Sequence, residues 1–122
     1  MDKEQFDYVA KRADILVSSN ASTQVTKDAA QAWKDAVAAD DSYEAAEAAT
    51  AQLLDILEGR PTTIDGVIAF AEGPAREMFG EEAAAHLLAR QQQRKEQGAK
   101  FCDCDACTAA SEILAEFGRI EL

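Results

Sequence analysis

Apolar side chains recur at every third or fourth position along most of the chain, the spacing that places them on one face of an α-helix. A first stretch of this kind covers about residues 3–18, with the stripe Phe6, Val9, Ala10, Ala13, Leu16 and Val17. Similar stretches lie at about 22–39, 42–58 and 106–117. The pattern predicts an amphipathic helix in each of these four segments.

Residues that favour helix ends separate these stretches. Ser22 or Thr23 can begin the second helix, because a short hydroxyl side chain accepts a hydrogen bond from the first turn. Asp41, with Glu44 three residues later, has the spacing of a capping box. Gly59 provides a left-handed helix end, and Pro61 prevents continuation. The loops between the predicted helices are therefore short.

The pattern changes after Pro61. Residues 63–72 are rich in β-branched side chains, so a strand is the alternative to a short helix capped by Thr62 or Thr63. A lone strand has no partner for its backbone, which favours the helix. Pro74, after a glycine, predicts a helix from 74 to about 97 that Gly80 could divide. Its end, residues 91–97, is wholly polar and is expected to project into water or to contact a partner.

These segments together predict an all-α fold, a compact bundle of about five or six helices. The chain of 122 residues has the usual length of a single domain. We expect residues 1–122 to form one helical domain, with Trp33, the only tryptophan, as a core anchor. The many alanines predict close helix packing, and a large exposed apolar face would favour a homodimer or a helical protein partner.

Charge and hydropathy exclude several classes of function. The net charge is -11, and no basic stripe is present that could neutralise phosphates. Binding to nucleic acid or to an anionic membrane surface is therefore not expected. No apolar run approaches the roughly 20 residues that span a bilayer. The charged start of the chain does not resemble a signal peptide, so we expect a cytoplasmic protein.

The chemistry of the sequence is concentrated in a thiol-rich loop at about 101–107, before the last helix. Cys102, Cys104 and Cys107, the only cysteines, form a Cys-x-Cys-x-x-Cys cluster. Thiolates are among the best ligands for zinc, and a two-residue gap lets two sulfurs reach one ion. The start of a helix favours thiolates, and a bound cation would offset the charges of Asp103 and Asp105. The sequence predicts a metal site, with zinc as the favoured ion.

A tetrahedral zinc site needs a fourth ligand. His86, the only histidine, lies roughly 16 Å before the end of its predicted helix. The link from 98 to 102 spans at most about 14 Å, so Cys102 would only just reach back to it. Other candidates are Asp103, a water or substrate, and a thiolate of a second subunit. An iron–sulfur cluster is less favoured, because it usually takes four cysteines of one chain.

Two other functions are consistent with the sequence. Cys104 and Cys107 could form a redox dithiol at a helix start, with Cys102 as resolving thiol, although the βαβ context of thioredoxin-type motifs is absent. Alternatively, the protein is a non-catalytic helical interaction module. No glycine-rich phosphate loop, nucleophile elbow or dinucleotide fingerprint occurs, so the sequence assigns no catalytic residue and does not decide whether the protein is an enzyme.

Overall fold

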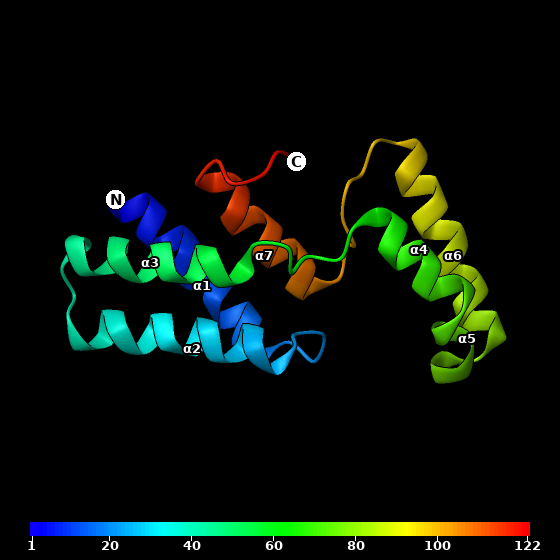
Figure 1. Ribbon diagram of the computed structural model, residues 1–122, viewed down its shortest axis with the longest axis horizontal. Helices are drawn as coiled ribbons and strands as arrows, with labels where there is room; N and C mark the ends of the chain where they lie inside the picture. The colour runs from blue at the N-terminus through cyan, green and yellow to red at the C-terminus, as the bar shows by residue number, and fades with distance from the viewer. The chain divides into compact units, whose positions relative to one another are not determined.

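A computed structural model describes residues 1–122. It confirms the all-α class, with no strand and seven helices (Figure 1): α1 Lys3–Ser18, α2 Gln24–Ala39, α3 Tyr43–Leu57, α4 Ile64–Glu72, α5 Pro74–Phe79, α6 Glu81–Glu96 and α7 Asp105–Glu116. The prediction of five or six helices was too low, because Gly80 divides the predicted helix 74–97 completely. Its φ of 91° belongs to a region that side chains with a Cβ rarely adopt, so the helix ends there and a new one begins.

Short polar side chains begin most of the helices. Thr23 accepts a hydrogen bond from the backbone of Thr26, and Thr63 accepts one from Gly66, which confirms two predicted caps. The prediction of Asp41 as the cap of α3 was wrong: Ser42 takes that position and accepts from the backbone of Ala45. A serine hydroxyl directly before the first turn satisfies an N–H that Asp41, one residue further back, does not reach.

Contacts within the chain define two compact units. The first contains Met1–Pro61 and Cys104–Glu121, and the second contains Thr62–Asp103 together with Leu122. The first unit therefore holds α1, α2, α3 and α7, and the second holds α4, α5 and α6. The expectation of one domain over residues 1–122 stays a prediction, which calorimetry tests.

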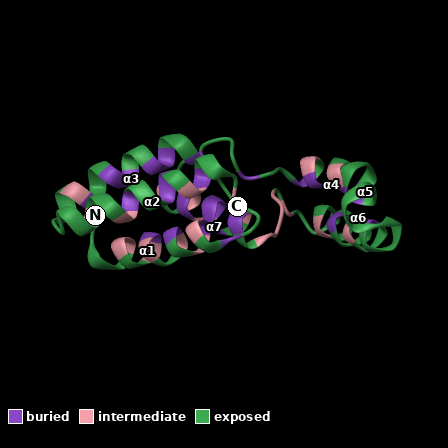
Figure 2. Cartoon of the chain, turned by 90° about the horizontal axis from the view of Figure 1, so that it is seen from below, coloured by how far each residue is buried: buried purple, intermediate pink, exposed green.

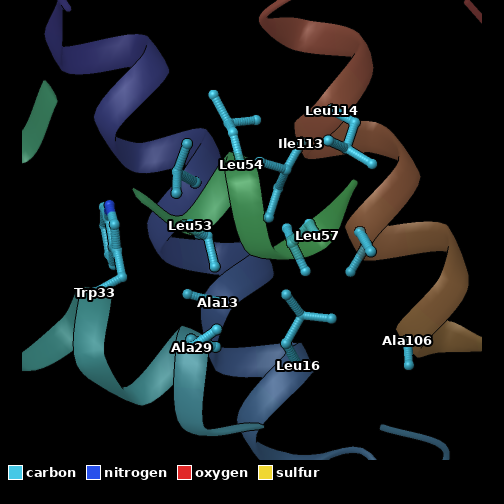
Figure 3. Close-up of a cluster of buried hydrophobic side chains, with 14 of the residues drawn as sticks. Ala13, Leu16, Ala29, Trp33, Leu53, Leu54, Leu57, Ala106, Ile113 and Leu114 are labelled. Carbon is cyan, nitrogen blue, oxygen red and sulfur yellow. The ribbon is translucent and has the colours of Figure 1, made fainter. Parts of the chain in front are cut away.

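The larger apolar core belongs to the first unit. Helix α1 packs against α2 and α7, and α2 packs against α3. Leucines and alanines of these helices interlock there (Figure 3), and Trp33 is buried among them as predicted. The indole N–H of Trp33 donates to the hydroxyl of Thr50 at 2.9 Å, so its polar atom is satisfied inside the core.

The second unit has a smaller core. Helix α4 packs against α6, and α5 contacts both. Few positions of α4, α5 and α6 are coloured as buried (Figure 2). The buried apolar residues are mostly small: Ile64, Val67, Ala71, Ala75 and Ala84. The stretch 63–72, for which a strand was the alternative, is helical over Ile64–Glu72.

After α6 the chain reverses at Gly98 and returns to the start of α4. A single antiparallel bridge pairs Phe101 with Thr63. The backbone N–H of Ile64 donates to the carbonyl of Lys100 at 2.9 Å, and that of Cys102 donates to Thr62 at 2.8 Å. These bonds fix the approach to the thiol-rich loop within the second unit. No helix is both long enough and apolar enough to cross a membrane.

Candidate metal centre

The three cysteines lie on one continuous segment that leads into α7. Cys104 is the N-cap of this helix: its Sγ accepts a hydrogen bond from the backbone N–H of Cys107 at 3.3 Å. Cys107 lies in the first turn, and Cys102 lies two residues before the cap. The helix start therefore determines the positions of two of the sulfurs, and the bond from Cys102 to Thr62 holds the backbone of the third.

The segment brings the three sulfurs together. The Sγ atoms of Cys102, Cys104 and Cys107 all lie within 4.8 Å of one another, and the three side chains are half-buried. Two sulfurs on one tetrahedral zinc ion are separated by about 3.8 Å, given a Zn–S bond of about 2.3 Å. Small rotations of the side chains can close that difference. The sulfurs are thus near enough to hold a metal ion, as predicted.

Asp105 contributes to the scaffold of this segment. Its Oδ1 accepts from the hydroxyl of Ser19 at 2.6 Å and from the backbone N–H of Ala106 at 2.8 Å. Ser19 is itself buried, and its Oγ also accepts from the backbone of Ala21. The carboxylate therefore joins the start of α7 to the end of α1 within the first unit.

Asp103 is held by a different set of partners, all on α6. Arg90 donates to its Oδ2 at 2.5 Å and Gln91 donates to its Oδ1 at 2.9 Å. The Nε of Arg94 lies 3.8 Å from the same Oδ2. The guanidinium of Arg94 also donates to the amide oxygen of Gln91 at 2.7 Å and to the carbonyl of Phe101 at 2.8 Å. Both carboxylate oxygens of Asp103 are thus engaged within the second unit.

The protonation of Asp103 reflects this environment. Partial burial acts to raise the pKa of its carboxyl, but the hydrogen bonds from Gln91 and Arg90 and the charges of Arg90 and Arg94 act more strongly in the opposite direction. The pKa of Asp103 is therefore below its usual value. The negative charge that the sequence places between two cysteines is compensated by the two arginines.

The two further ligand candidates differ from the cysteines in their positions. His86 is exposed on α6, and its ring nitrogens do not belong to the group of ligand atoms that lie within 4.8 Å of one another. Asp103 is also outside that group. The sequence suggested that the two aspartates favour a bound cation. In the structure, Asp103 is paired with residues of α6 and Asp105 with Ser19, so their presence does not require a cation.

Sequence reasoning missed the residues that hold the segment. Residues 91–97 were expected to project into water or to contact a partner, yet Gln91 is 0% exposed within the chain itself and both ends of its amide are hydrogen-bonded. A signal existed: Arg94 lies four residues after Arg90 and three after Gln91, spacings that bring side chains together on a helix, and an acidic residue follows shortly after the helix. Ser19 gave no such signal, since it lies 86 residues from Asp105.

The alanine-rich faces form a shallow groove of about 260 Å³ between α2 and α3. Its lining includes Ala32, Ala36 and Ala48, which are exposed, and Ile56, which is 40% exposed. The floor of the groove includes Ala49, which is buried in the core. Association through this groove, with a second copy or with another helical protein, stays a prediction.

Searches against protein-family models, curated proteins and solved structures found no match to this chain.

Proposed function

We propose that this protein binds a thiophilic metal ion, with zinc as the favoured ion, through the Sγ atoms of Cys102, Cys104 and Cys107, and acts as a small accessory or sensor module. The observation that carries the proposal is the mutual distance of these sulfurs, at most 4.8 Å. Thiolate clusters select zinc, monovalent copper and iron–sulfur centres over harder cations. Three cysteines suit a mononuclear ion better than a cluster, which usually takes four.

The surroundings of the sulfurs support a deprotonated, metal-binding state. The N–H of Cys107 donates to the sulfur of Cys104, and both residues lie at the positive end of the α7 dipole. Each of these interactions is stronger with a thiolate than with a thiol. The neighbouring carboxylates are held by Arg90, Gln91 and Ser19, which limits their repulsion of further negative charge.

Metal content and affinity test the proposal. The protein is purified without added metal, its metal is quantified, and the stripped protein is titrated with zinc against a chromophoric chelator. We expect close to one equivalent for the native chain and none for the variant in which all three cysteines are replaced by serine. His86→Gln is the matched control and should bind zinc like the native chain. Equal zinc binding by the native chain and the triple serine variant would contradict the proposal.

The redox dithiol is the second candidate function. It is favoured by the position of Cys104 and Cys107 at the N-terminus of α7, where a thiolate accepts a backbone N–H. The rate of alkylation of metal-stripped protein, followed against pH, tests this function. A free cysteine has a pKa of about 8.5, and for a redox dithiol at least one cysteine should react as a thiolate well below that pH. Slow labelling of all three would exclude this function.

A further inference from the structure

We infer that the ion held by Cys102, Cys104 and Cys107 takes its fourth ligand from outside the chain, and that this ligand is the thiolate of a small molecule. The inference rests on the proposed metal site and specifies the ligand class that the site accepts. It concerns one coordination position, so it can fail while the three-cysteine site stands.

The chain itself supplies three metal ligands at the proposed site, the sulfurs of Cys102, Cys104 and Cys107. Among the histidine, cysteine and acidic side chains, only the three sulfurs form a group whose ligand atoms lie within 4.8 Å of one another. Zinc is almost always four-coordinate in proteins, and sites with three protein ligands accept water or substrate at the fourth position. The position that the chain does not fill is therefore available to an external donor.

The neighbouring carboxylates are poorly suited to fill that position. To bind the ion, Asp103 would have to give up Arg90 or Gln91, and the amide of Gln91 is completely buried. No ligand atom of Asp105 belongs to the group within 4.8 Å, and its Oδ1 accepts from the hydroxyl of buried Ser19 and from the N–H of Ala106, so turning this carboxylate toward the ion would disturb both bonds. Leaving buried polar groups unpaired costs about 1–3 kcal/mol for each group.

The character of the site favours a thiolate among external donors. An ion selected by three sulfurs is thiophilic, so a fourth sulfur matches it better than an oxygen does. The half-buried sulfurs leave the ion within reach of a small molecule. In the exchange the bond between metal and water breaks, a metal–sulfur bond forms, and the thiol proton passes to the buffer. The positive end of the α7 dipole offsets part of the added negative charge.

Cobalt substitution provides the test, because Co²⁺ occupies zinc sites and its charge-transfer absorption grows with the number of bound thiolates. The stripped full-length protein is kept reduced with a phosphine, loaded with one equivalent of Co²⁺ and titrated with 2-mercaptoethanol. We expect the charge-transfer intensity to rise by about one third, as three thiolates become four, and to saturate. His86→Gln should give the same rise. An unchanged spectrum, or loss of cobalt to the added thiol, would overturn the inference.

The starting spectrum separates this result from two others. Absence of any thiolate-to-cobalt band before thiol is added would remove the proposed metal site itself. A four-thiolate intensity at the start, with a dimeric mass in sedimentation, would show that a cysteine of a second copy fills the position and would overturn the small-molecule ligand. A three-thiolate spectrum on a monomer, followed by the rise with thiol, supports the inference.

Discussion

Cys104 combines an observed structural role with a proposed role in metal binding, and substitutions can separate the two. It caps α7 through the N–H of Cys107, and it is one of the three proposed ligands. Serine can replace sulfur as a cap but is a poor ligand for zinc, whereas alanine can do neither. Cys104→Ser and Cys104→Ala should therefore differ in metal-free protein and behave alike toward metal.

The expected magnitudes follow from the size of the first unit. Replacing a good N-cap by alanine costs about 1 kcal/mol. If the first unit of about 80 residues unfolds by itself, its unfolding entropy is about 0.17 kcal/mol/K, so this cost corresponds to about 6 °C in the unfolding midpoint. Zinc at 100 times its dissociation constant stabilises the native state by about 2.7 kcal/mol. With the same unfolding entropy, this stabilisation corresponds to a rise of about 16 °C in the unfolding midpoint.

Thermal unfolding followed by the fluorescence of Trp33, which lies in the core of the first unit, measures both effects. With chelator present, Cys104→Ser should melt about 6 °C above Cys104→Ala. With zinc at 100 times its dissociation constant, the unfolding midpoint of the native chain should rise by about 16 °C. Neither Cys104 variant should show this rise.

The matched pair Cys107→Ser and Cys107→Ala serves as control, because residue 107 donates its backbone N–H to the cap and does not itself cap α7. Neither Cys107 variant should be stabilised by zinc, and in chelator the two should have similar unfolding midpoints. Equal midpoints of the two residue-104 variants in chelator would refute the cap. A full zinc shift in Cys104→Ser would refute its role as ligand.

Other parts of the structure give further expectations. Thr50→Val should destabilise the first unit by about 1–3 kcal/mol in urea unfolding, because it leaves the N–H of Trp33 buried without an acceptor. Burial raises the pKa of Tyr8, so its phenol should ionise above the usual pH of about 10, and stability should fall as the pH rises through that raised pKa. Absorbance at alkaline pH measures the first effect, and Tyr8→Phe should remove the second. Asp103→Asn should lower the stability of the second unit by about 1 kcal/mol, since Gln91 and Arg90 then donate to a neutral side chain in place of a carboxylate, as followed by circular dichroism. Calorimetry of the native chain should show one transition if residues 1–122 form one domain, and two resolved transitions would contradict that prediction.

The helices were predictable because their signals are local. The three- to four-residue spacing of apolar side chains found α1, α2, α3 and α7, and Thr23, Thr63 and Gly59 marked ends that the structure confirms. Local signals have limited resolution, however. Ser42 and Asp41 are both good caps, and only the backbone geometry decides that the hydroxyl of Ser42 reaches the first turn.

The scaffold around the cysteines was not predictable to the same extent. The spacing of the thiols predicted that the sulfurs would lie close together, because all three cysteines fall within six residues of chain. The partners of Asp103 and Asp105 depend on tertiary packing: Gln91 meets Asp103 only because the chain reverses at Gly98. Polarity alone predicted that Gln91 would face water or a partner. The sequence does not distinguish such a residue from one whose amide is buried and hydrogen-bonded at both ends.

The alternation of cysteine and aspartate in the segment now has a physical explanation. If the carboxylates faced the sulfurs, their charge would oppose thiolate formation in metal-free protein, and they would compete as hard ligands for the ion. Instead, Asp103 binds Arg90 and Gln91, while Asp105 binds Ser19 and the first turn of α7. The carboxylates thus hold the backbone on both sides of Cys104, and in the proposed metal site the three sulfurs are the ligands that this segment supplies.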